Sequence, residues 1–219
     1  MITLYHCHEA RSMRVLWLLH ELELEFELIV MPFAELRSED YLPIHPLARV
    51  PALLDGELTL FESGAICQYL CERYSLNKLG RHQDSPERTE WLQWLHYAET
   101  LAVHGASLVQ QHLVIYDPEL RSATVQKLER KRLEKGLGVL ERHLEGQDYL
   151  LASGFSAVDV AVGYSIHLGQ YFTDIKQYPR VSQYYQRLSQ RPAFQAAMPD
   201  DGATDLIFRQ PFYGDPQVE

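Results

Sequence analysis

The residue types best suited to chemistry lie near the start of the chain, in the stretch YHCHEARSMR. Cys7 supplies a thiol, Ser12 a hydroxyl and Arg11 a positive charge, all around the start of an expected helix. The amides of a helix N-terminus lower the pKa of a nearby thiol, so this position favours a thiolate. The stretch is either a thiol-handling site or an ordinary helix start, because Cys7 is also a common apolar filler and Ser12 a common cap.

The histidines and the other cysteines do not point to a metal. Strand geometry places His6 and His8 on one side of the backbone and Cys7 on the other, and nothing completes a tetrahedral set. Cys67 and Cys71 lie four residues apart on an expected helix and continue its apolar stripe, so we expect them in the core. Three cysteines without zinc-type spacing predict neither a metal nor a disulfide framework, and indicate a reducing compartment.

The first half of the chain has the pattern of a βαβ unit followed by ββα. In order, it predicts a strand over residues 1–6, a helix over 13–22, a strand over 26–31, two short strands over 51–61 and a helix over 62–74. The first and third elements should pair in parallel, because a helix connects them. Asp55-Gly56 suits a type I′ hairpin turn, so the last two strands should be antiparallel.

The second half shows helical patterns only. Residues 77–86 are polar and form an expected linker, which divides the chain into domains over 1–76 and 87–219. The apolar helix over 156–172 should be buried, and Ser156 and Asp159 should form a capping box at its start. We expect core positions at four aromatic residues and along one leucine-rich stripe: Trp91, Trp94, Tyr97, Tyr116, Val125, Leu128, Leu133, Leu137, Leu140 and Leu144.

Composition excludes several classes of protein. The 219 residues include 20 Lys and Arg against 30 Asp and Glu, a net charge of −10, which disfavours nucleic acid and anionic membranes as partners. Hydrophobic residues make up 46% and charged residues 23%, as in ordinary globular proteins. The apolar runs are too short to span a bilayer and the N-terminus lacks a signal-peptide pattern, so we expect a cytoplasmic protein.

Two segments, taken with this order of elements, resemble the cytosolic glutathione transferase superfamily. They are RVPALLDGELTLFESGAICQYL, over residues 49–70, and GFSAVD, over residues 154–159. The resemblance covers nearly the whole chain. It implies an α/β thioredoxin-like N-terminal domain that binds glutathione, and an all-α C-terminal domain that forms most of the wall for an electrophilic second substrate. It also implies a homodimer, because many members form one.

The resemblance assigns glutathione-binding residues by position. Val50-Pro51 matches a Val-Pro pair whose cis proline turns the preceding backbone toward the cysteinyl part of glutathione. Glu62-Ser63 matches the pair that holds the γ-glutamyl end: Ser63 and the amides of a helix start favour its carboxylate, and Glu62 its ammonium group. His45 and Arg49 stand where relatives line the groove with polar residues. His45 and Ala48 depart from the family's amide and glycine, which leaves the glycyl end open.

The catalytic position departs from the family. Serine-type relatives have a pattern resembling Ser-Arg-Ser-x-Arg, and the corresponding residues here are Ala10-Arg11-Ser12-Met13-Arg14, so the first serine is replaced by alanine. Ser12 is one replacement. The amides near Ala10, acting with Arg11, are a second. Cys7 is the third, since Cys7-His8-Glu9-Ala10 occupies the position of the Cys-Pro-x-Ala motif in omega-type members. The missing proline and the negative charge of Glu9, which disfavours a thiolate, count against it.

Three functions follow from these alternatives. The first is a glutathione transferase, with glutathione as co-substrate, no metal, and a small hydrophobic electrophile as partner. The second is a monothiol disulfide or dehydroascorbate reductase that acts through Cys7. The third is a non-catalytic scaffold on the same fold. The retained Val50-Pro51 and Glu62-Ser63 pairs favour an enzyme over a scaffold.

Overall fold

The computed structural model describes residues 1–75, 78–200, 202–203 and 206–213. The chain forms two compact units. The first combines Met1–Arg88 with Gln190–Ile207, and the second combines Thr89–Ser189 with the residues from Phe208 on. The predicted domain boundary between residues 76 and 77 lies outside the described residues.

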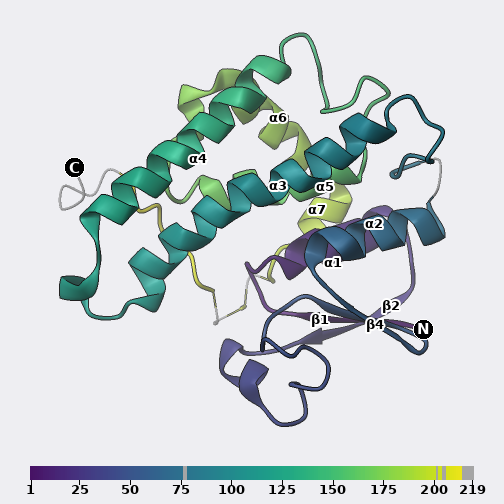
Figure 1. Ribbon diagram of the computed structural model, residues 1–219, viewed down its shortest axis with the longest axis horizontal. Helices are drawn as coiled ribbons and strands as arrows, with labels where there is room; N and C mark the ends of the chain where they lie inside the picture. Colours follow the sequence, from purple (N-terminus) through teal and green to yellow (C-terminus); the bar gives the residue numbers. More distant parts are fainter. Residues whose placement is uncertain (76–77, 201, 204–205, 214–219) are drawn as a thin grey trace. The chain divides into compact units, whose positions relative to one another are not determined.

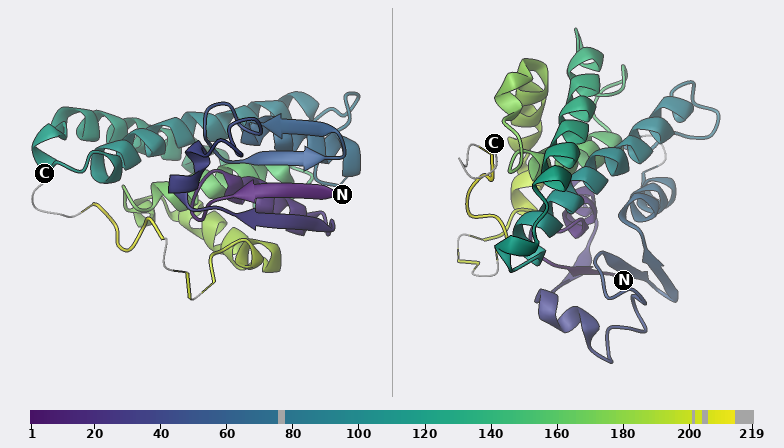
Figure 2. Two further views of the ribbon diagram at one scale, coloured as in Figure 1. Left: turned by 90° about the horizontal axis from the view of Figure 1, so that it is seen from below. Right: turned by 60° about the vertical axis from the view of Figure 1, so that its left-hand side comes forward.

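The first unit contains the predicted βαβ-ββα order. Its elements are β1 (Ile2–His6), α1 (Ser12–Glu21), β2 (Phe26–Val30), a 3-10 turn (Phe33–Arg37), β3 (Ala52–Asp55), β4 (Leu58–Phe61) and α2 (Ser63–Tyr74). The strands lie side by side in the order β2-β1-β3-β4 (Figure 2), with β1 and β2 parallel and the other pairs antiparallel. The α/β prediction for this half is confirmed.

The hairpin turn differs from the prediction. Asp55 pairs with Leu58, so the two central residues of the turn are Gly56 and Glu57. Of these only Gly56 has a positive φ, of 61°. One positive φ at the first central position is the pattern of a type II′ turn, whereas type I′ needs two.

Helix α1 is buried all round rather than along one face. All residues from Ser12 to Leu19 are buried, so this part of the helix has no exposed face. The reason lies far along the chain, because α7 (Pro192–Ala196) packs against α1 (Figure 1). The ring of Phe194 meets the indole of Trp17 edge-on, with the ring centroids 4.9 Å apart. The sheet covers one side of α1 and α7 contacts another.

Among its described residues, the second unit is built of helices joined by turns and loops, without a strand, as predicted. Its main elements, visible as the long ribbons of Figure 1, are α3 (Arg88–Val109) with a π-helical turn (Gln110–Val114), α4 (Ala123–His143), α5 (Ala157–Gly169) and α6 (Pro179–Ser189), with 3-10 turns at Pro118–Leu120 and Ile175–Gln177. Within the part of the chain that the structure describes, no helix has the length and apolar character needed to cross a membrane.

Helix α5 is the core of this unit. All of its residues are buried, as its apolar sequence predicts. The capping box of Ser156 and Asp159 is present at its start. The Asp159 carboxylate accepts hydrogen bonds from the Ser156 N–H at 2.7 Å, the Leu150 N–H at 3.0 Å and the Tyr184 hydroxyl at 2.8 Å. One buried carboxylate therefore joins the loop before α5 to α6.

Some expected core positions are wrong. Tyr116 is 89% exposed, because it follows the π-helical turn and lies outside the helices. Val125 and Leu128, near the start of α4, are also exposed, whereas Leu133, Leu137, Leu140 and Leu144 are buried. Helix α4 contacts α3 further along, where the Tyr97 hydroxyl donates to the Gly136 carbonyl at 3.0 Å. Trp91, Trp94, Cys67 and Cys71 are buried as predicted.

Asp159→Ala should destabilise the protein by about 3 kcal/mol or more, because three buried donors lose their acceptor. Asp148→Ala is the matched control: its exposed ion pair with Arg187 should contribute about 1 kcal/mol at most. Urea unfolding of the three proteins measures both changes. Equal losses in the two variants would contradict the role of Asp159.

Acid should destabilise the protein through His167. Burial lowers the pKa of His167 to about 4, and its Nδ1 lies 2.7 Å from the Tyr185 hydroxyl. The unfolded chain, with a histidine pKa of about 6.5, binds the proton first as the pH falls. The stability from neutral His167 is therefore complete above about pH 6.5 and is lost as the pH falls toward about 4.

Between about pH 7.5 and about pH 4.5, wild type should lose about 2 to 3 kcal/mol more unfolding free energy than His167→Gln. The exposed His96 on α3 provides the control variant, His96→Gln, which should follow wild type. Denaturant unfolding at the two pH values measures the difference. A His167→Gln protein as acid-sensitive as wild type would rule out this source.

Candidate functional site

Three segments with candidate site residues leave the sheet at the same edge, by which we mean the edge formed by the ends of β1, β3 and β4 and not an outer strand. Tyr5 of β1 pairs with Ala52 of β3, and Ala52 pairs with Phe61 of β4, so one row of residues crosses the three strands. Beyond this row lie residues 7–12 after β1, residues 49–51 before β3, and residues 62–63 after β4. The strand order therefore brings the predicted thiol site and the predicted glutathione-binding residues together.

Ser12 closes the turn between β1 and α1. Its hydroxyl accepts a hydrogen bond from the Cys7 N–H at 3.3 Å and donates one to the Cys7 carbonyl at 3.2 Å. The Ser12 side chain is fully buried. A hydroxyl engaged in this way fixes the backbone of the turn, which favours the structural interpretation of Ser12 over the catalytic one.

Cys7 is also fully buried, in an apolar cluster with Met31, Leu36, Tyr41 and Ala52. The environment suits a packing role, since reactive cysteines are typically partly exposed. The Tyr5 ring lies 5.3 Å from that of Tyr41 and packs against the same cluster.

The accessible part of the turn includes His8, Ala10 and Arg11, which are all partly exposed. Arg11 is the N-cap residue of α1 and provides no side-chain cap. Of the three candidate catalytic residues, Arg11 is thus the one whose side chain reaches the surface. The first-turn amides of α1 favour negative charge at this place.

The segment before β3 contains the predicted cis peptide, between Val50 and Pro51. The Tyr41 hydroxyl donates to the carbonyl of Arg49 at 2.6 Å and so fixes the backbone that precedes the cis bond. Ala48 has a φ of 52°, in the left-handed region that favours glycine. The Arg49 side chain is exposed at this edge.

His45 packs beneath this segment. The imidazole is buried and lies 5.0 Å from the ring of Phe61, and its Nδ1 accepts the Leu47 N–H at 3.3 Å. Burial lowers the pKa of His45; Arg49 acts in the same direction and Glu62 opposes it. His45, Arg49 and Glu62 therefore share one electrostatic environment, although they come from different segments.

The start of α2 combines a strained backbone with a buried cation. Glu62 has a φ of 75° and an exposed side chain. Ser63 is buried, and its hydroxyl accepts a hydrogen bond from the Arg14 guanidinium at 3.1 Å. A non-glycine residue at positive φ is costly and often marks a functional position. Arg14 adds positive charge where the helix amides already favour a carboxylate.

Sequence reasoning missed Arg14, which is 1% exposed inside the first unit. The signal was present, because Arg14 is a charged residue directly before Val15 and Leu16 on a helix that is otherwise apolar there. A charged side chain among core positions requires a polar partner. Ser63 is one such partner, 49 residues further along the chain.

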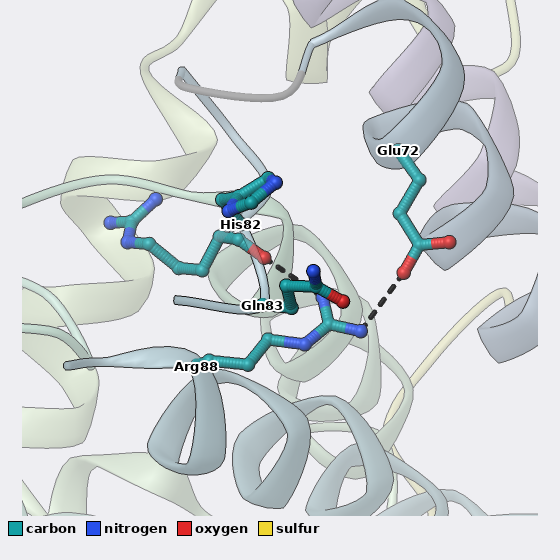
Figure 3. Close-up of a pocket in the computed structure, with 5 residues that line it drawn as sticks. Glu72, His82, Gln83 and Arg88 are labelled. Atoms are coloured by element: carbon teal, nitrogen blue, oxygen red, sulfur yellow. Dashed lines mark hydrogen bonds and ion pairs between the residues drawn. The ribbon is translucent and has the colours of Figure 1, made fainter. Parts of the chain in front are cut away.

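A second feature of the first unit is a polar pocket lined by Glu72, Arg81, His82, Gln83 and Arg88 (Figure 3). The Arg88 guanidinium donates to Glu72 and to the Arg81 carbonyl, both at 2.9 Å. Glu72 lies nine residues after Ser63, roughly 14 Å along the helix axis. The pocket is thus at the other end of α2 from the candidate site. Among the described residues, no His, Cys, Asp and Glu side chains group to hold a metal.

The fold and the site define a class: a thioredoxin-like domain with a cis proline beside its sheet, in a chain that continues as a helical domain. Comparison with known proteins gives the same result. Residues 1–72 match the N-terminal domain of glutathione S-transferases and residues 110–198 match the C-terminal domain. The chain belongs to the glutathione S-transferase family, so the resemblance seen in the sequence is confirmed.

Individual relatives match along most of their length. A glutathione S-transferase of Arabidopsis thaliana is 33% identical, covering 85% of this chain and 89% of that protein. One from Schizosaccharomyces pombe is 30% identical, covering 89% and 93%. The solved structure of a sphingomonad glutathione S-transferase complexed with glutathione is 25% identical, with a TM-score of 0.79 and coverage of 90% and 96%.

Ser12→Ala should lower the free energy of unfolding by about 1 to 2 kcal/mol, because the buried Cys7 N–H loses its acceptor and the Cys7 carbonyl keeps only the Ala10 N–H of its two donors. Ser189→Ala, which removes an exposed hydrogen bond to Gln186, is the control and should change stability far less. Thermal or urea unfolding measures both. If Ser12→Ala is as stable as the control, the hydroxyl does not hold the turn.

Proposed function

We propose that the protein is a glutathione transferase that activates the glutathione thiol and presents it to a small apolar electrophile. The observation that carries the proposal is the meeting, at one edge of the sheet, of the β1–α1 turn, the cis Val50–Pro51 peptide and the Glu62–Ser63 pair. Family membership supports the class of reaction.

In this proposal the tripeptide is bound along the edge of the sheet. Ser63, the amides that begin α2 and the cation of Arg14 hold the γ-glutamyl carboxylate, while Glu62 pairs with the ammonium group. The backbone at Val50 pairs with the cysteinyl unit beside the cis bond. Arg49, exposed near His45, is the candidate for the glycyl carboxylate.

The thiol is activated without a side-chain hydroxyl. Ala10 has none, and the hydroxyl of Ser12 is occupied by Cys7. The amides at the start of α1 and the Arg11 cation stabilise the thiolate, which lowers the pKa of the thiol. The thiol proton passes to solvent and the sulfur attacks the electrophilic carbon. A leaving group then departs with the electron pair, or the pair is protonated on the product.

The alternatives have less support. A monothiol reductase would need Cys7 to attack a disulfide, and Cys7 is buried among apolar side chains. A scaffold would have no use for a strained Glu62 next to a serine bound by a buried arginine. A homodimer and a cytoplasmic location are further proposals. The three cysteines, all among the described residues, are buried and form no disulfide, which agrees with a reducing compartment.

Glutathione binding tests the proposal. Calorimetric titration near neutral pH should show that wild type and Cys7→Ser bind glutathione equally, while Ser63→Ala binds about tenfold or more weakly, since a charge-assisted contact is worth at least about 1.4 kcal/mol. Conjugation of a model electrophile should follow the same order. Ser189→Ala, at a partly exposed position in the second unit, is the control and should behave as wild type.

Two results would contradict the proposal. A wild type that does not bind glutathione would indicate a scaffold. Binding without conjugation, together with disulfide reduction that Cys7→Ser abolishes, would assign the reaction to Cys7 instead.

A further inference from the structure

The turn that activates the thiol contains a buried acid. Glu9 lies between β1 and α1 with a φ of 59°, and its side chain is 7% exposed. The Glu9 Oε2 accepts a short hydrogen bond from the N–H of Ile207. This contact joins residues 198 positions apart within the first compact unit.

The Glu9 contact is one of several within the first unit that join the start of the chain to the described residues 190–200, 202–203 and 206–207, which we call the return segment. Arg191 donates to both carboxylate oxygens of Glu21, at 2.6 and 2.7 Å. Phe194 packs edge-on against Trp17. The segment thus meets the start of the chain in reverse order of sequence: Arg191 at Glu21, Phe194 at Trp17 and Ile207 at Glu9. Of its described residues, Arg191 and Phe194 contact α1, and Ile207 contacts the turn before that helix.

The position of Glu9 is difficult to explain by stability alone. A non-glycine residue in the left-handed region is strained, and a buried carboxylate is costly unless hydrogen-bonded. A negative charge beside a thiolate site also opposes the thiolate. These costs are consistent with a contact that is kept because it holds the turn in one conformation.

We infer that Glu9 is a positioning residue: by accepting the Ile207 N–H, it ties the return segment to the β1–α1 turn and fixes the amides that stabilise the glutathione thiolate. This inference rests on the proposed transferase function. Ser12 holds the turn from inside, through Cys7, and Glu9 holds it from the return segment. The γ-glutamyl residues lie on α2, so loss of the tie should impair thiol activation more than glutathione affinity.

Two substitutions at Glu9 separate the tie from the charge. Glu9→Ala removes both, and Glu9→Gln removes the charge but keeps an oxygen that can accept the Ile207 N–H. Glu9→Ala should reduce the thiolate fraction and the rate of conjugation by about tenfold or more, with the glutathione Kd within about threefold of wild type. In Glu9→Gln the thiolate fraction and the rate of conjugation should equal or exceed those of wild type, because the charge that repels the thiolate is gone.

Glu23→Ala is the matched control. Glu23 has nearly the same backbone conformation, with a φ of 53°, but its side chain is exposed in the turn after α1. The control places alanine at a left-handed position and leaves the Glu9–Ile207 hydrogen bond intact. It should behave as wild type in thiolate absorbance and conjugation.

Amide hydrogen exchange at Ile207 provides a readout independent of activity. The amide should be protected in wild type and Glu9→Gln and exchange rapidly in Glu9→Ala. Two results would overturn the role of Glu9. One is unchanged protection of the Ile207 amide in Glu9→Ala. The other is a wild type that forms the thiolate together with a Glu9→Ala variant that shows the same pKa for the glutathione thiol. A wild type that forms no thiolate would instead overturn the proposed function, and the exchange data would still show whether the tie exists.

Discussion

The structure depends on how five residues, 7–11, connect β1 to α1. The turn must reverse the chain after β1, an inner strand of the sheet, and still leave the start of α1 accessible. The hydroxyl of Ser12 achieves the first by binding both backbone groups of Cys7. Burial of Cys7 with Met31, Tyr41 and Ala52 anchors the turn to the core. Ala10 and Arg11 are left at the surface, at the point where the helix amides favour negative charge.

The other parts of the site are positioned by the same sheet. The antiparallel pairing of β1, β3 and β4 brings three chain segments to one edge, and the Tyr41 hydroxyl, from the cluster that buries Cys7, fixes the Arg49 carbonyl before the cis proline. Arg14 extends this arrangement from α1 to α2, since its guanidinium binds Ser63. The β1–α1 turn, the cis peptide and the start of α2 are thus connected through α1 and the core beneath it.

Local pattern was enough to predict much of this. Alternation and helical periodicity predicted the strands and helices of both units, and Val50-Pro51 and Glu62-Ser63 could be placed by resemblance. The long-range contacts of the first unit could not be predicted, because each joins distant residues: Arg14 with Ser63, Glu9 with Ile207, and Trp17 with Phe194. Periodicity reports one apolar face and says nothing of a second, so it missed α7 on α1. Periodicity also placed Tyr116 in the core, although the π-helical turn ends at Val114 and Tyr116 is exposed.

If the start of α1 activates the thiol without a catalytic hydroxyl, the pKa of glutathione must fall on binding. This pKa can be measured on wild type by following thiolate absorbance across a pH series. We expect an apparent pKa at least about one unit below that of an ordinary cysteine thiol, near 8.5, and the same value in Cys7→Ser. A bound thiol that titrates as it does free in water would show that the start of α1 does not activate it.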